Sequence, residues 1–183
     1  MIVSRPEKTF EPLPVGLEPA ICINYFDLGL QRGFRGKTQH KVVLLFELEA
    51  RKKDGTAFLA SKKYTASLDE KANLLKDLQS WRGVAFTDQE LRGFNLDSIK
   101  GKGCQLNLVS IRKADGDPYT VVDTIMRPRK DWKPFQVQTA PDYIPDWILE
   151  AIDAQIGPGQ GHGAPDIEDD VTYDSQPDLE PIF

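Results

Sequence analysis

A chain of 183 residues, 40% of them hydrophobic, is long enough for one domain with its own core, so folding requires neither disulfides nor a metal. Its longest apolar run, Val42–Phe46, is far too short to span a membrane. The N-terminus is charged and contains early prolines, which is unlike a signal peptide. Cys22 and Cys104 both fall in predicted strands, as buried cysteines of a reducing compartment do. We therefore expect a cytoplasmic protein with no membrane contact.

The charge of the chain is divided unevenly along its length. All 23 lysines and arginines lie in residues 1–133 together with 17 of the 28 acids, which gives this part a net charge of +6. Residues 134–183 contain the other 11 acids and no lysine or arginine, which gives −11. This asymmetry suggests a surface that binds a polyanion and a separate interaction tail. An ordinary solvated surface with a disordered end explains the composition equally well.

Five segments show the apolar–polar alternation that is typical of strands: 18–28, 41–50, 57–65, 103–112 and 119–127. In the first, we expect Ile21, Ile23 and Tyr25 on one face and Ala20, Cys22 and Phe26 on the other. In the second, Val42, Leu44, Phe46 and Leu48 alternate with Lys41, Val43, Leu45, Glu47 and Glu49. Asp54-Gly55 marks a hairpin turn between the second and third strands.

Three segments show helical patterns. Ser67 and Glu70 form a capping box before a broad apolar stripe, which predicts a helix over 67–82 that ends at Gly83. Thr87 and Glu90 form a second capping box, which opens a short helix ending near Gly93. A third helix is predicted over 141–156. Trp81, on the apolar stripe of the first helix, is assigned to the core with Phe46 and Phe58.

The order of three strands, a helix and two strands is that of the OB-fold, a Greek-key barrel whose helix plugs one end. The sequence therefore predicts a mainly β protein: a five-stranded OB-fold Greek-key barrel with a helix between strands 3 and 4, plus a C-terminal helix and a disordered acidic tail. An α+β sheet with one covering helix would show the same order. We expect an extended N-terminal arm (1–15), the OB-fold nucleic-acid-binding domain (16–133), a C-terminal helical extension (134–156), a Gly-rich linker (157–165) and an acidic interaction tail (166–183).

Catalytic chemistry is poorly supported. The two histidines, His40 and His162, lie far apart, and the two cysteines lack the spacing of a zinc site. Phosphate-binding glycine loops and hydrolase motifs are absent from the sequence. Glu47 and Glu49 lie two apart on one strand, and a solvated strand face explains them better than a metal pair. We therefore expect no enzyme, no cofactor and no metal.

Nucleic-acid binding is better supported, because OB-folds bind single strands with a positive groove and stacking aromatics. Basic and aromatic residues interleave in the loop between the first two strands, on the third strand and after the fifth. The structural alternatives are that Phe34 anchors its loop, Tyr64 belongs to the barrel and Trp132 packs under the third helix. The candidate nucleic-acid contacts are Arg32, Phe34, Arg35, Lys37, Lys62, Lys63, Tyr64, Arg112, Arg127, Arg129, Lys130, Trp132 and Lys133.

We expect the acidic tail to present a terminal apolar pair whose carboxylate is free. A partner can capture such an end with a basic rim, an apolar socket for the last ring and donors for the carboxylate. A purely solubilising tail would explain its acids, but not why its most apolar dipeptide comes last. The candidate partner-binding residues are Asp178, Glu180, Pro181, Ile182 and Phe183.

The tail resembles that of bacterial-type single-stranded DNA-binding proteins, although here Pro181 precedes Ile182 whereas the bacterial tip usually has the reverse order. Separately, the segments 64–72, 81–83 and 86–91 resemble a family of phage and prophage replication-module proteins, described as OB-fold single-stranded DNA-binding proteins. The resemblance implies sequence-independent coating of single-stranded DNA during replication or recombination. It also implies that the tip recruits helicase, polymerase, nuclease or recombinase partners.

We therefore expect a non-catalytic single-stranded DNA-binding protein of a phage replication or recombination module, in the cytoplasm of its bacterial host. The alternative is a protein–protein adaptor in such a complex, whose barrel binds a protein. The sequence leaves open whether the chain assembles as a homo-oligomer.

Overall fold

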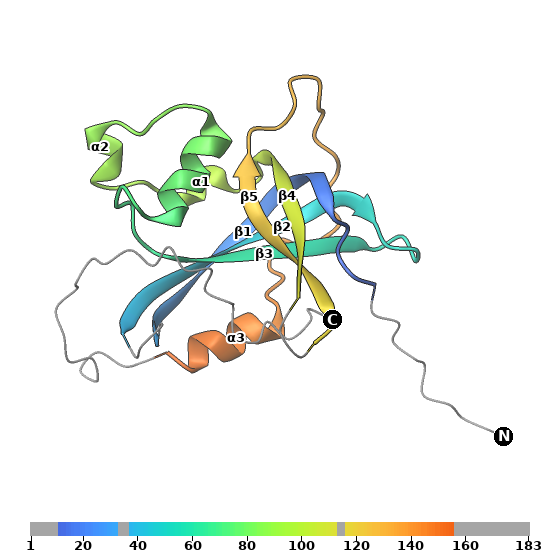
Figure 1. The fold of residues 1–183 in the computed structure, drawn as a ribbon, viewed down its shortest axis with the longest axis horizontal. Coiled ribbons are helices and arrows are strands. Elements are labelled where there is room, and N and C mark those ends of the chain that lie inside the picture. The colour runs from blue at the N-terminus through green and yellow to red at the C-terminus, as the bar shows by residue number, and fades with distance from the viewer. Residues whose placement is uncertain (1–10, 33–36, 113–115, 156–183) are drawn as a thin grey trace.

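The computed structural model describes residues 11–32, 37–112 and 116–155, and the elements given below belong to this part of the chain. The strands are β1 (Gly16–Arg32), β2 (Thr38–Arg51), β3 (Ala57–Thr65), β4 (Gly103–Arg112) and β5 (Pro118–Met126). The helices are α1 (Asn73–Arg82), α2 (Asp88–Leu91) and α3 (Asp146–Asp153), and a 3-10 turn, η2, covers Leu96–Ile99. The described chain is mainly β, and α1, α2 and η2 lie between β3 and β4 in the sequence (Figure 1).

The five predicted strands are confirmed, and they form one antiparallel sheet in the order β3-β2-β1-β4-β5. β1 and β2 are longer than the apolar alternation indicated. Their pairing continues through Gly29 opposite Lys41 to Arg32 opposite Thr38, where the side chains are largely polar. The two strands therefore form a long hairpin that extends past the rest of the sheet (Figure 1).

Two β-bulges in β1 change which side chains face the core. The pairing of β1 with β2 shifts register between Cys22 and Asn24 and again between Asp27 and Gly29. Each shift adds one residue to β1, and one added residue moves the following side chains to the other face. Tyr25 therefore packs with Ala20 and Cys22, whereas Ile23 packs on the opposite face. The predicted grouping of Ile21, Ile23 and Tyr25 on one face was wrong for this reason.

The larger apolar cluster lies between the sheet and α1. Leu74, Leu75, Leu78 and Trp81 of α1 pack in one cluster with alternate residues of β2, including Phe46. Trp81 is 7% exposed, its ring centroid lies 6.1 Å from that of Phe46, and its Nε1 donates to the carbonyl of Gly103 at 2.7 Å. Phe58 is buried in the same cluster. The assignment of Trp81, Phe46 and Phe58 to the core is confirmed.

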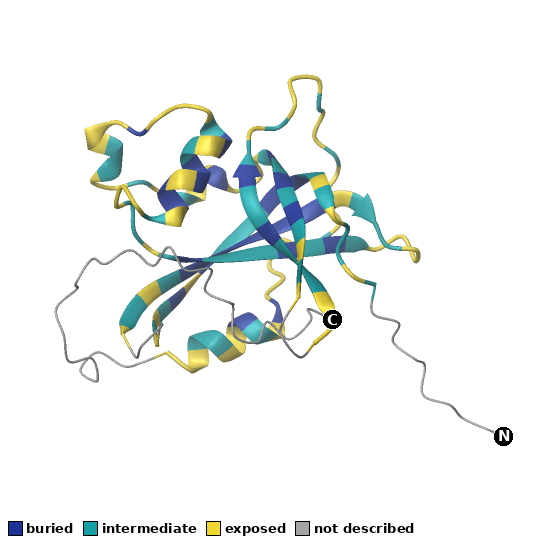
Figure 2. Ribbon diagram, viewed as in Figure 1, coloured by how far each residue is buried: buried dark blue, intermediate teal, exposed yellow. Residues whose placement is uncertain are grey.

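A smaller apolar cluster covers the other face of the same strands. Val43 and Leu45 of β2 point away from α1 and pack with Phe26, Leu28 and the fully buried Ile148 of α3. Gln31 also donates to the carbonyl of Ala151 at 2.8 Å. Figure 1 shows α3 on the side of the sheet opposite α1, and Figure 2 shows buried residues in the strands between them. Part of the outer face of β1 and β2 is therefore covered by α3.

The first helix begins later than its sequence indicated. Ser67 Oγ accepts the amide of Asp69 at 3.1 Å, and Asp69 in turn accepts the amide of Lys71 at 3.3 Å. These short-range bonds stabilise turns that compete with a helix. The predicted capping box of Ser67 and Glu70 was therefore wrong, and α1 starts at Asn73 without a side-chain cap. Gly83 ends α1 in the left-handed conformation, at φ 70°, as expected.

The other two helical predictions had different outcomes. The capping box of Thr87 and Glu90 is confirmed, because each residue's side chain accepts the backbone amide of the other. The last helix begins at Asp146 rather than residue 141. Pro145 precedes its first residue, and a proline disfavours helical conformation at the residue before it.

A polar network joins the edge strands β3 and β5 to α1. Lys62 Nζ lies 2.7 Å from Asp77 Oδ2 and also donates to the carbonyl of Asp123 on β5. The Tyr64 hydroxyl donates to the same Asp77 oxygen at 2.7 Å. Burial, and then the nearby Asp77 charge, raises the pKa of Tyr64 well above its usual value, so the phenol keeps the proton that it donates. This network brings the two edges of the sheet together over α1.

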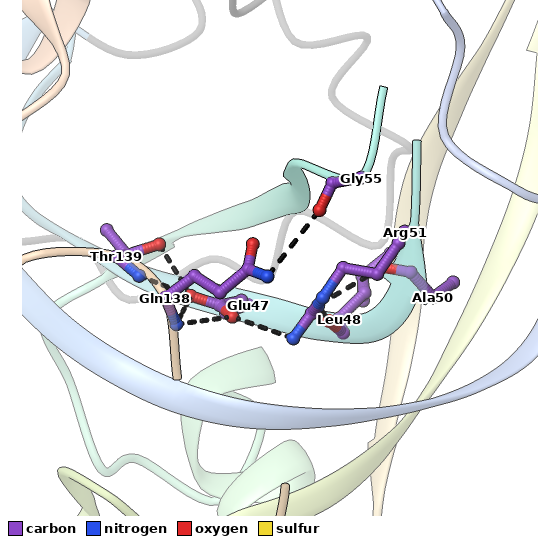
Figure 3. Close-up of polar contacts among 7 residues, drawn as sticks. All are labelled: Glu47, Leu48, Ala50, Arg51, Gly55, Gln138 and Thr139. Atoms are coloured by element: carbon purple, nitrogen blue, oxygen red, sulfur yellow. Dashed lines mark hydrogen bonds and ion pairs between the residues drawn. The ribbon is translucent and has the colours of Figure 1, made fainter. Parts of the chain in front are cut away.

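Glu47 holds the segment that leads to α3 (Figure 3). Its carboxylate is fully buried and accepts the backbone amides of Gln138 and Thr139 at 2.9 Å, and the Thr139 hydroxyl at 2.6 Å. Arg51 Nη2 lies 3.2 Å away and balances its charge. The expected solvated strand face is therefore wrong at Glu47, although Glu49 is exposed as expected. The chain after β5 is fixed to β2 by this buried anchor.

Candidate nucleic-acid interface

The basic segment, residues 127–133, follows β5 directly. Arg127, Arg129, Lys130 and Lys133 are exposed, and among the described residues none of them has an ion-pair partner within 4.0 Å. Apart from Asp131, the side chains of this segment are basic, aromatic or proline. Several cations therefore project into solvent from one short stretch of chain.

Trp132 fixes the basic segment to the start of β4. A Cβ added to Gly103 would lie 2.1 Å from the Trp132 ring, so the ring packs directly on the backbone there. The Trp132 amide donates to the Arg129 carbonyl at 3.0 Å, and Phe135 meets the ring edge-on at 6.3 Å between centroids. Trp132 is half-buried and lies away from the α3 cluster. The sequence allowed Trp132 either to contact a base or to pack under the third helix. Its neighbours show a packing role, but the ring packs on β4 and not under the third helix.

A cleft of about 550 Å³ opens beside the basic segment, between the last turn of α1, η2 and the start of β4. We call it the basic cleft. Three cations line it, and most of the remaining lining is apolar. The residues that line it are Leu78, Trp81, Arg82, Phe94, Ser98, Ile99, Lys102, Gly103, Arg127 and Pro128.

The three cations of the basic cleft differ in how far they are neutralised. Arg82 Nη2 pairs with Glu90 at 2.8 Å, and its guanidinium lies over the rings of Phe86 and Phe94, at 4.4 and 5.9 Å from their centroids. Arg127 donates to the carbonyl of Arg82, at the C-terminal end of α1. Lys102 is exposed and has no ion-pair partner among the described residues. The cleft therefore carries an excess of positive charge.

The acid nearest these cations is itself held by the fold. The backbone amide of Thr87, followed by the Arg82 guanidinium, lowers the pKa of Glu90. Glu90 therefore stays ionised and keeps its pairing with Arg82 at neutral pH. The Arg82 atom Nη1 is buried and has no hydrogen-bond partner in the part of the chain that the structure describes.

The other predicted nucleic-acid residues are placed at several points. Arg32 and Lys37 are exposed at the two ends of the β1–β2 connection, and Arg112 is exposed at the end of β4. Phe34 and Arg35 lie outside the described residues. No hydrogen bond or ion pair among the described residues joins Arg32 or Lys37 to the basic segment, so the structure gives no direct link between these two clusters.

The third-strand cluster lies largely inside the fold. Tyr64 is 3% exposed, and the Lys62 side chain is 17% exposed and bound to Asp77. Lys63 is half-buried. A ring enclosed in the core offers no face to a base. In this structure Tyr64 therefore packs inside the fold, which was the alternative to contacting a base.

Arg82 and Lys102 are cations of the cleft that sequence reasoning did not single out. Arg82 entered only as the end of the predicted helix and within the segment 81–83 of the resemblance, and Lys102 belonged to no predicted element. A signal was present, because Lys100, Lys102 and the segment 127–133 flank predicted strands that pair with each other. Ends of neighbouring antiparallel strands lie close together, so these cations were candidates for one surface.

Among the described residues, no group of three or more His, Cys, Asp or Glu side chains is placed to hold a metal ion. No helix of the same residues has the length and hydrophobicity needed to cross a membrane. Cys22 and Cys104 are unbridged and buried, and burial raises the pKa of the Cys22 thiol to about 12. The predicted tail residues Asp178, Glu180, Pro181, Ile182 and Phe183 lie outside the described residues. No protein-family model and no curated protein matches the chain.

Proposed function

We propose that the chain is an OB-fold protein that binds single-stranded DNA with little sequence preference. Three features of the fold support the OB-fold assignment. The sheet order is β3-β2-β1-β4-β5, α1 lies between β3 and β4, and the Lys62–Asp77–Asp123 network draws the two edge strands together. A five-stranded, partly open barrel with a helix at one end has this arrangement.

The basic segment carries the functional proposal. Its four exposed cations have no acidic partner among the described residues, and Trp132 fixes them in place on β4. A positively charged track with aromatic residues beside it is the common design of proteins that bind single strands without sequence preference. The cations therefore contact phosphates, and the adjoining basic cleft extends the same positive surface.

The position of α3 restricts the route of the strand. OB-folds commonly bind ligands on the face of strands 2 and 3 and with the loops beside it. Here part of that face is filled by α3, because Val43, Leu45 and Leu59 pack with Ile148 and its neighbours. We therefore assign the strand to the basic segment.

A protein–protein adaptor is the second candidate, and one observation favours it. Tyr143, Ile144 and Leu149, on and just before α3, are 37–46% exposed. Exposed apolar side chains suit a protein partner better than a nucleic acid. In either case we propose that the acidic tip, Asp178–Phe183, recruits replication or recombination proteins.

Removing the cations of the basic segment tests the DNA-binding proposal. The triple variant Arg129→Ala, Lys130→Ala, Lys133→Ala should bind oligo-dT more weakly at low salt, because it neutralises fewer phosphates and releases fewer counterions. The slope of log affinity against log salt should become shallower by about 0.7 for each phosphate that the variant no longer neutralises. Fluorescence titration at several salt concentrations measures both quantities.

A matched triple variant controls for net charge. Lys53, Lys76 and Arg92 are also exposed and lie outside the basic segment and the basic cleft. Lys53→Ala, Lys76→Ala, Arg92→Ala should leave the slope close to that of the wild type. Equal reductions of affinity in the two triple variants would mean that only the overall charge matters, and the assigned route would then be wrong.

A further inference from the structure

The basic cleft has the size and lining of a ligand site. Its volume of about 550 Å³ lies within the range of about 300–1,000 Å³ found for small-molecule pockets. Its lining includes the buried Leu78, Trp81 and Ile99 and the half-buried Phe94. Such a lining favours a flat apolar group, and the three cations at its edges favour an anion attached to that group.

The basic cleft and the basic segment form one continuous surface. Arg127 and Pro128 line the cleft and also begin the segment that continues to Arg129, Trp132 and Lys133. A strand whose phosphates lie on this segment passes the mouth of the cleft. A phosphate at that point can reach Lys102, which is exposed and has no acidic partner among the described residues. The attached base then lies over the apolar lining.

The wall of the cleft offers stacking partners for a base. The Phe94 ring is half-buried and meets Phe86 edge-on at 5.0 Å between centroids. The planar Arg82 guanidinium lies above both rings and is held by Glu90. Bases stack on aromatic rings and on guanidinium planes, and stacking tolerates every base because each has a π-face.

We propose that the basic cleft binds one nucleotide of a single strand, with its phosphate at Lys102 and Arg127 and its base against Phe94 and the Arg82 guanidinium. This inference rests on the proposed function, since it assigns one subsite of the same strand. The competing occupant is an acidic peptide with an apolar end, for which the cleft also has a basic rim and an apolar floor. The continuity of the cleft with the basic segment favours the nucleotide.

Photo-crosslinking tests the position of the base. An oligo-dT strand with one 5-iodouracil should crosslink to Phe94 or Trp81, as mapped by mass spectrometry. Crosslinks found only outside the cleft, with oligo-dT binding intact, would overturn the nucleotide subsite and leave the proposed function standing. If the wild type binds no oligo-dT, both the subsite and the proposed function are overturned.

Amide chemical shifts then show whether the cleft recognises the whole nucleotide or only its phosphate. They also show whether an acidic peptide binds there instead. On addition of dTMP, shifts should concentrate at Ser98, Lys102 and Gly103, and they should be larger than with thymidine or inorganic phosphate alone. If phosphate alone gives the same shifts as dTMP, the cleft is only an anion site. If a peptide of residues 174–183 shifts these amides and dTMP does not, the occupant is a peptide. Either result would overturn the proposal.

Two charge reversals test the phosphate site without disturbing the core. Lys102→Glu should weaken oligo-dT binding about tenfold at low salt, since it replaces an attraction to phosphate by repulsion. Lys76→Glu makes the same charge change on the exposed side of α1 and should have a much smaller effect. Phe94→Ala should also weaken binding about tenfold, as removal of a stacking partner does. Equal effects of Lys102→Glu and Lys76→Glu would contradict the assignment.

Discussion

Replacing Glu47 by alanine should lower the free energy of unfolding by about 3–5 kcal/mol, which is the usual cost of removing one partner from a buried ion pair. The variant leaves Arg51 without its carboxylate and removes the acceptor of two backbone amides, those of Gln138 and Thr139. Unpaired buried donors add to the destabilisation. Urea denaturation followed by circular dichroism measures the change.

The Glu47 variant should also loosen α3, because the segment that Glu47 anchors (Figure 3) is followed in the chain by α3. Hydrogen exchange at Ile148 and Ala151 should therefore accelerate more than exchange in β4. Glu49→Ala is the matched control: it lies two residues away on the same strand, it is exposed, and it should change stability by no more than about 0.5 kcal/mol. Equal destabilisation at positions 47 and 49 would contradict the anchor.

An alanine at Asp77 should cost a similar amount, about 3–5 kcal/mol. It leaves the Lys62 ammonium without its carboxylate and the buried Tyr64 hydroxyl without its acceptor. Because the same network links β3, α1 and β5, the destabilisation should appear as one cooperative transition at lower denaturant concentration. Chemical denaturation monitored by tryptophan fluorescence reports it, since Trp81 lies on α1.

Replacing the whole network by apolar residues separates two effects on stability: the destabilisation by one unpaired buried charge, and the net contribution of the network itself. The triple variant Lys62→Met, Tyr64→Phe, Asp77→Leu removes all three side-chain polar groups together. Buried ion pairs replaced by apolar residues of similar size often cost little stability, so the triple variant should recover most of the stability that Asp77→Ala removes. Recovered stability would show that Lys62 has a structural role in this network. A triple variant less stable than Asp77→Ala would mean that the charges themselves stabilise the fold.

The elements predicted from the sequence were those that depend on neighbouring residues. Alternation along each strand located all five, and Thr87 with Glu90 marked α2 because a capping box is closed within four residues. The same reasoning failed at Ser67. There the hydroxyl had two possible backbone partners, and it accepts the nearer amide of Asp69. The two bulges in β1 have no simple sequence signal, so the faces of that strand were assigned incorrectly.

The features that were missed depend on distant residues. Glu47 is buried because a segment 91 residues further along the chain covers it. The two-residue spacing of Glu47 and Glu49 does not predict that burial. Tyr64 is enclosed because it packs in the apolar cluster beneath α1, where Asp77 accepts its hydrogen bond. Arg82 and Lys102 line one cleft only because α1 lies beside the start of β4. The basic segment, by contrast, was visible as a run of cations, and its four cations are exposed.

The most direct test of single-strand binding is titration of the wild-type protein with oligo-dT and with duplex DNA at several salt concentrations. We expect tighter binding to the single strand, with a log–log salt slope of about −0.7 for each phosphate neutralised. A salt-independent affinity would contradict an electrostatic track on the basic segment. Tighter binding to the duplex would contradict the assignment as a single-stranded DNA-binding protein.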